Sequence, residues 1–191
     1  MHTSHKPESL RQTLKERIEA AAHCSVADCY QCGKCSAGCP VAGESEVAPN
    51  QILRMLQLDI PELEERALGS EMIWLCLGCQ TCVSRCPQGV DLPSAMDALR
   101  AESAKLGKVH PRAKDIVAFH RAFLDSIESN GRSFEFGLIL GYKMRTLHLM
   151  QDVALAPKML AKGKLKFFPH RVHNREAIAR IFERAAQEEK A

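Results

Sequence analysis

Eight of the nine cysteines in this 191-residue chain fall into two runs of identical spacing. Each run reads C-x2-C-x2-C-x3-C-P, and each position of the second run lies 47 residues after its counterpart in the first. The first run contains Cys29, Cys32, Cys35 and Cys39, and the second contains Cys76, Cys79, Cys82 and Cys86. Thiolates at this spacing bind the irons of [4Fe–4S] clusters. The two runs therefore predict two such clusters and a protein that passes electrons one at a time.

The same spacing occurs in bacterial two-cluster ferredoxins, where the fourth cysteine of each run binds the cluster of the other run. Carried over to this chain, the rule predicts one ligand set for each cluster. Cluster I would be bound by Cys29, Cys32, Cys35 and Cys86, and cluster II by Cys76, Cys79, Cys82 and Cys39. Structural zinc also uses paired cysteines, but it does not require this longer pattern twice over. The crossed ligation predicts that the two halves of the site fold together.

The overall composition is that of an ordinary soluble globular chain, with a net charge of +3 and 26% charged residues. Aromatic residues make up only 5%, which argues against a stacking platform for nucleic acid. The odd number of cysteines and their ligand spacing argue against a secreted disulfide scaffold. The N-terminal residues contain no apolar core of a secretory signal, and no stretch has the length of a membrane span. We therefore expect a cytoplasmic protein without direct membrane insertion and without a nucleic-acid partner.

The segments around the cysteine runs have the hydrophobic periodicity of helices and the residues that commonly begin and end them. Apolar residues recur every three or four positions, and proline and glycine stand at the expected helix starts and ends. The expected helices cover residues 7–23, 61–68, 92–106 and 111–130, and further helices begin at Pro49 and Ser70. No segment alternates like a strand. We predict an all-α fold, an α-helical ferredoxin whose two helical halves surround the two clusters, over residues 1–131.

Residues 132–191 differ in character and are predicted to form a helical extension that docks on another subunit. The segment 155–175 is basic and interrupted by proline, with Leu165 and Phe168 among its charges. Apolar groups between charges favour a protein interface over a nucleic-acid surface. A last amphipathic helix is expected over residues 175–189.

Other residues near the cysteines could tune or protect the clusters, because cluster potential depends on burial and on N–H···S hydrogen bonds. Glycines that would let the backbone approach sulfur are Gly33, Gly38, Gly78 and Gly89. Aliphatic residues that would exclude water are Val41, Ile52, Ile73, Leu75, Leu77, Val83 and Val90. Lys34 and Arg85 flank ligands, and we expect them to be solvated, or else to raise a potential or to face a redox partner.

Cys24 lies outside both runs, five residues before Cys29. We expect a buried free thiol at the end of the first helix, and a redox-sensing thiol is the alternative. The eight histidines show no ligand spacing, and no phosphate loop, nucleophile elbow or H-E-x-x-H motif occurs. No catalytic residue is therefore predicted.

The two cysteine runs in a small helical chain resemble those of the C subunit of heterodisulfide reductase. The tail over residues 156–165 and 168–172 is similar to that family's order of helix, glycine, apolar run, proline and basic residue, and the resemblance covers about residues 20–185. It implies a non-catalytic relay between a flavin-containing A-type subunit and a CCG-type B subunit that handles a disulfide or another sulfur compound. Iron–sulfur subunits of membrane-linked dehydrogenases, which exchange electrons with quinone, share the cysteine runs and are the alternative.

Overall fold

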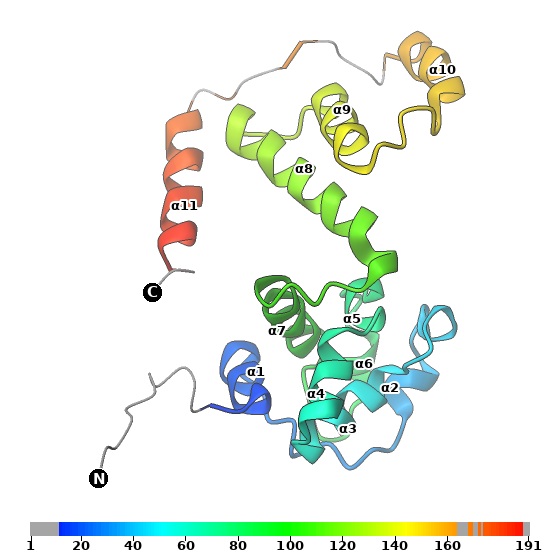
Figure 1. Cartoon of the computed structure of the whole chain (residues 1–191), viewed down its shortest axis with the longest axis vertical. Coiled ribbons are helices and arrows are strands. Elements are labelled where there is room, and N and C mark those ends of the chain that lie inside the picture. Colours follow the sequence, from blue (N-terminus) through cyan, green and yellow to red (C-terminus); the bar gives the residue numbers. More distant parts are fainter. Residues whose placement is uncertain (1–11, 164–167, 170–171, 173, 189–191) are drawn as a thin grey trace. The chain divides into compact units, whose positions relative to one another are not determined.

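The computed structural model describes residues 12–163, 168–169, 172 and 174–188. Over this part the prediction of an all-α fold is confirmed, because the described residues form helices and turns and contain no strand (Figure 1). Among the described helices, none is both long and apolar enough to cross a membrane. The chain divides into two compact units, Met1–Ala113 and Lys114–Ala191. The predicted division near residue 131, between a cluster domain and a docking extension, concerns function and stays a prediction.

The first unit contains all nine cysteines and a series of mostly short helices (Figure 1). In chain order these are α1 (Leu14–Ala22), α2 (Lys34–Ala37), η2 (Ala42–Glu44), α3 (Pro49–Leu58), α4 (Pro61–Leu68), α5 (Met72–Leu75), α6 (Thr81–Arg85), α7 (Leu92–Lys105) and η3 (Pro111–Ala113). The helix starts predicted at Pro49 and Pro61 are confirmed. Proline suits the first helical position because the N–H that it lacks has no partner there. Each cysteine run begins in the loop before a short helix, α2 or α6, and continues through it.

Helix α7 follows the second cysteine run and organises the unit. Asp91 caps its N-terminus, since the Asp91 Oδ1 accepts a hydrogen bond from the backbone N–H of Ser94 at 3.1 Å. Gly107 follows its C-terminus with a φ of 66°, a left-handed conformation that favours glycine. The helix packs against α1, α4, α5 and α6. The elements on both sides of the second run are thereby held in one core.

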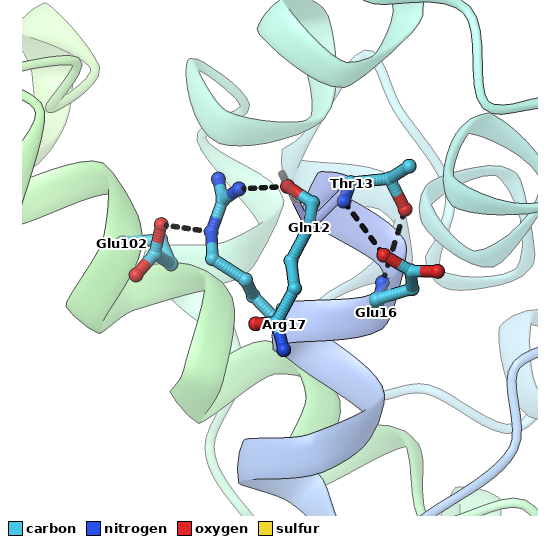
Figure 2. Close-up of polar contacts among 5 residues, drawn as sticks. All are labelled: Gln12, Thr13, Glu16, Arg17 and Glu102. Atoms are coloured by element: carbon cyan, nitrogen blue, oxygen red, sulfur yellow. Dashed lines mark hydrogen bonds and ion pairs between the residues drawn. The ribbon is translucent and has the colours of Figure 1, made fainter. Parts of the chain in front are cut away.

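Helix α1 begins at Leu14, within the range predicted for it, and residues 7–11 of that prediction lie outside the described part. Its start is set by a capping box between Thr13 and Glu16 (Figure 2). The Thr13 hydroxyl accepts from the Glu16 N–H at 3.3 Å, and the Glu16 carboxylate accepts from the Thr13 N–H at 2.9 Å. Two donors at the helix end that would otherwise lack partners are satisfied in this way.

Arg17 fastens α1 to α7. Its Nε donates to the Glu102 carboxylate at 3.0 Å, and its Nη1 donates to the Gln12 carbonyl at 2.9 Å (Figure 2). Leu14 and Ile18 of the same helix are buried, at the four-residue spacing of an amphipathic helix.

Replacing Thr13 with Ala should destabilise the protein by about 1 kcal/mol, because one N–H of the first turn of α1 loses its acceptor. Denaturant unfolding monitored by far-ultraviolet circular dichroism checks this value. Gln12→Ala is the matched control, since only the backbone carbonyl of Gln12 is used. Equal losses in the two variants would contradict a role for the Thr13 side chain.

The core of the first unit is formed mainly by α1, α3, α5 and α7. Its fully buried large side chains include Ile18, Ile52, Leu53, Leu56, Met72, Ile73, Met96 and Leu99. The helix that begins at Pro49 thus turns Ile52, Leu53 and Leu56 into the core. Burial of these side chains supplies the hydrophobic stabilisation that holds the cysteine loops in place.

The second unit is described by itself. Its helices are α8 (Lys114–Asn130), α9 (Glu135–Thr146), η4 (Val153–Leu155), α10 (Ala156–Ala161) and α11 (Arg175–Glu188), and α8 packs against both α9 and α11. Gly131 ends α8 as predicted, with a φ of 77°. Several apolar side chains here are exposed, among them Leu140, Met144, Leu147, Met150 and Phe168. The predicted tail residues 164–167 and 170–171 lie outside the described residues, and docking by this unit stays a prediction.

Candidate iron–sulfur centres

Both cysteine runs fold through the same left-handed turns. The residue before the second cysteine, Gln31 or Gly78, has a φ of 62° in both runs. The residue after it, Gly33 or Gln80, has a φ of 74° or 61°. Each run thus uses one glycine and one glutamine, in exchanged positions. The glycines adopt this left-handed conformation without strain. Sequence reasoning did not predict it for the two glutamines. The only sign in the sequence is that each glutamine lies 47 residues from a glycine of the other run.

Each pair of turns leads into a short helix that contains the third cysteine. Cys35 lies in α2 and Cys82 in α6, and these two helices pack against each other. Gly38 makes room at this point, because a Cβ there would lie 2.6 Å from Nη1 of Arg85. The exposed Arg85 side chain therefore crosses the backbone beside Cys39, the last cysteine of the other run.

Two neighbouring hollows are lined by the cysteines. The smaller hollow is lined by Cys29, Cys32, Cys35, Cys82 and Cys86. The larger hollow is lined by Cys35, Cys39, Cys76, Cys79 and Cys82. Each hollow therefore collects the first three cysteines of one run and the fourth of the other, while Cys35 and Cys82 line both. All eight predicted ligands are brought to the hollows, and their assignment to particular clusters stays a prediction.

The donor chemistry of the hollows fits iron–sulfur clusters. Each offers thiols of both runs within a largely apolar wall, and thiolates are the usual ligands of [4Fe–4S] clusters. Within the described residues, no three cysteine, histidine or carboxylate side chains gather closely enough to hold a single metal ion. The ligands of a cube of four irons stand farther apart than those of one ion.

The cysteines differ in exposure in the same way in both runs. Cys32 and Cys79, the second cysteines, are exposed, whereas the other ligands are partly buried. Cys35 and Cys82, the third cysteines, line both hollows. Each hollow thus has one cysteine toward solvent and two that also line the neighbouring hollow.

Hydrogen bonds reach several of the sulfurs, as predicted for loops that tune a cluster. The backbone N–H of Val90 donates to the Cys86 Sγ at 3.3 Å. The Gln31 Nε2 donates to the Cys29 Sγ at 3.5 Å. Such donors favour the reduced, more negative state of a cluster. The side-chain contribution of Gln31 was missed by sequence reasoning, which considered glycines, aliphatic residues and the cations Lys34 and Arg85.

The thiols differ in acidity in the cluster-free chain. Burial raises the pKa of Cys82 to about 11 and also raises the pKa of Cys35. A hydrogen bond with the Thr81 hydroxyl, 3.4 Å from the Cys79 Sγ, lowers the pKa of Cys79. Iron binds the thiolate, so the partly buried Cys35 and Cys82 must each release a proton when a cluster is inserted at neutral pH.

The apolar wall differs in part from the predicted one. Val90 is buried beside the smaller hollow, as expected, but Leu77 is 67% exposed although it lines the larger one. Leu92 and Met96 of α7 are buried wall residues that sequence reasoning did not single out as such. Leu92 lines both hollows. The first turn of α7 therefore helps to keep water from the cysteines of both runs.

Cys24 lines neither hollow. It is partly buried, and its thiol donates to the Asp91 carbonyl at 3.7 Å. Burial and the nearby carboxylates of Asp91 and Glu19 raise the pKa of Cys24, which disfavours the reactive thiolate. These features favour the interpretation of Cys24 as an inert free thiol.

Comparison with known proteins agrees with this geometry. Residues 25–90 match the family model of the 4Fe-4S dicluster domain, a range that contains all eight cysteines of the two runs and excludes Cys24. The iron-sulfur C subunit of the CoB--CoM heterodisulfide reductase of Methanopyrus kandleri is 36% identical over 112 residues, which cover 59% of this chain and 57% of that protein. Over these residues the chain is similar to the C subunit of heterodisulfide reductase. The resemblance seen in the sequence is thereby confirmed, and so is an iron–sulfur cofactor.

Two further relatives are named as the same kind of subunit. The C subunit of the H(2):CoB-CoM heterodisulfide,ferredoxin reductase of Methanothermobacter thermautotrophicus is 29% identical over 58% of each chain. The C subunit of the Ferredoxin:CoB-CoM heterodisulfide reductase of Methanosarcina mazei is 29% identical over 64% of this chain and 76% of that protein. The chain spans somewhat more than half the length of the Methanopyrus and Methanothermobacter relatives.

Proposed function

We propose that this chain is the electron-relay subunit of a cytoplasmic heterodisulfide-reductase-like complex and that it binds two [4Fe–4S] clusters with crossed ligand sets. The observation that carries the proposal is the pair of adjoining hollows, each lined by three cysteines of one run and the fourth of the other. In the proposed assignment, Cys29, Cys32, Cys35 and Cys86 hold cluster I, and Cys76, Cys79, Cys82 and Cys39 hold cluster II.

A [4Fe–4S] cluster supplies the ability to take up and return a single electron. The residues of this chain would support that transfer in three ways. The cysteines fix its place, and the shared Cys35 and Cys82 bring the two sites together. The exposed Cys32 and Cys79 offer one solvent-facing point at each site for exchange with another protein. Leu92 and Val90 exclude water between and beside the sites.

The proposed partners are those that the resemblance to the C subunit of heterodisulfide reductase implies. An A-type subunit with a flavin would exchange electrons at one end, and a CCG-type B subunit would handle a disulfide or another sulfur compound at the other. The exposed apolar side chains of the second unit, such as Met144 and Leu147, would contribute a docking surface for one of them.

Replacing Cys35 with Ala should abolish electron transfer from the physiological donor to the B-type subunit in the assembled complex. Reduction of the B-type subunit by a reduced viologen dye should persist, because that donor bypasses this chain. Cys24→Ala is the matched control, since Cys24 lines neither hollow. If the Cys35→Ala complex transferred electrons from the physiological donor at the wild-type rate, the proposed relay role would be contradicted.

A further inference from the structure

Two side chains from different helices clamp equivalent points of the two cysteine runs. Gln57 of α3 donates to two carbonyls at the first run, and Arg100 of α7 donates to two carbonyls at the second. The carbonyl pairs belong to Val26 with Cys29, and to Ile73 with Cys76. Each member of one pair lies 47 residues from its counterpart in the other. The same backbone feature is therefore held by a neutral amide in one half and by a cation in the other.

At the first run the clamp is part of a hydrogen-bond network. The Gln57 Nε2 donates to the Cys29 carbonyl at 2.6 Å and to the Val26 carbonyl at 2.9 Å. The Gln57 Oε1 accepts from Gln31 at 3.3 Å and from Arg54 at 3.4 Å. Arg54 is exposed and donates to Gln57 rather than to a carbonyl of the run, so water and salt screen its charge.

At the second run the clamp is a guanidinium. The Arg100 Nε donates to the Ile73 carbonyl and its Nη2 to the Cys76 carbonyl, at the end of α5 where carbonyls lack partners within the helix. The Arg100 side chain is 21% exposed. Its ion-pair partner Asp97, 2.7 Å from Nη1, is 70% exposed and therefore offsets the charge only in part. A poorly solvated positive charge thus lies directly against the first ligand of the second run.

The charge is not needed for the clamp itself. Gln57 shows that a neutral amide can satisfy the same two carbonyls at the equivalent place. What Arg100 adds to this arrangement is a positive charge beside Cys76.

We propose that Arg100 raises the reduction potential of the cluster bound by the second run, an effect that Gln57 does not provide at the first. The inference rests on the proposed function, because it requires a cluster at Cys76. Uptake of one electron makes the site more negative by one charge, and a nearby cation favours the more negative state. The electron comes from the partner protein or, in a test, from dithionite, and no bond is formed or broken at Arg100.

The test is an anaerobic redox titration of the cluster-loaded chain without partners, followed by electron paramagnetic resonance and with dithionite as reductant. In Arg100→Gln we expect the one-electron equilibrium of one cluster to shift about tenfold toward the oxidised state, or about 59 mV. The other cluster should keep its potential. Cys79→Ala, which removes a proposed ligand of cluster II, should abolish the same signal that Arg100→Gln shifts.

Two controls separate charge from structure. Arg100→Lys keeps the charge and should keep the potential closer to that of the wild type than Arg100→Gln does. Arg54→Gln removes an exposed cation that contacts Gln57, the clamp residue of the first run. This change should move the potential of neither cluster. A purely structural role would lower iron content equally in the Gln and Lys variants without moving the potential of the clusters that remain.

Unchanged potentials in an Arg100→Gln chain with full iron content would overturn the inference. If that variant retains too little iron, Arg100→His gives the second measurement, because an imidazole carries a positive charge only at the lower end of the accessible pH range. The potential of the same cluster should then fall more steeply with rising pH than it does in the wild type, and an equal pH dependence in the two proteins would overturn the inference as well. The isolated chain is used here and the complex in the relay test, so the failures of the two proposals are distinguishable.

Discussion

Changing Cys29 and Cys86 together to Ala should remove one cluster and leave the other with its wild-type potential. The two residues stand in different cysteine runs but line the same hollow. A crossed assignment therefore places both losses on cluster I, and about four of about eight irons should remain, since each cube holds four. Iron analysis and redox-monitored electron paramagnetic resonance after anaerobic reconstitution measure the result.

The matched variant is Cys29→Ala with Cys39→Ala, which also removes two ligands but takes both from one run. Here each cluster loses one ligand, because Cys39 lines the other hollow. Both signals should change, and neither wild-type potential should survive. If the ligand sets followed the runs instead, the outcomes of the two variants would be exchanged.

Leu92→Ala should weaken the protein and both cluster sites at once. Leu92 is 3% exposed and lines both hollows. Truncation of a buried leucine costs about 2–5 kcal/mol, from lost burial and from the cavity that remains. The enlarged space also admits water to the cysteines of both runs. We expect faster loss of visible cluster absorbance in air, together with a lower free energy of unfolding measured under anaerobic conditions.

The control for Leu92 lies at the other end of the same helix. Leu106 follows α7 and is 49% exposed, so Leu106→Ala should change the free energy of unfolding by less than about 0.5 kcal/mol. Equal rates of cluster loss in the two variants would contradict a water-excluding role for Leu92.

The cysteine pattern made the cofactor predictable, because ligand spacing along the chain is a local property. Helix starts at Pro49 and Pro61 were predictable for the same reason, since proline acts on its own backbone. The left-handed turns at Gly33 and Gly78 have a local signal as well. Their counterparts at Gln31 and Gln80 do not, and only the surrounding fold holds these glutamines at a positive φ.

The clamps were beyond sequence reasoning because they depend on contacts between distant segments. Gln57 and Arg100 reach carbonyls 24 to 31 residues away in the chain. Neither belongs to a motif, and their helices place them only once the core has formed. Leu92 was assigned to a helix start but not to the wall between the hollows, because that wall exists only when the two runs meet.

The sharing of each hollow between the two runs also bears on the order of events during synthesis. A growing chain presents Cys29, Cys32 and Cys35 long before Cys86 emerges from the ribosome, so the smaller hollow lacks one wall for most of translation. The larger hollow must wait for Cys82 while Cys39 is already available. Insertion of either cofactor is therefore expected after the second run has left the ribosome. A prematurely terminated product that ends before Cys76 would offer cysteines to the assembly machinery without a complete place for either cofactor.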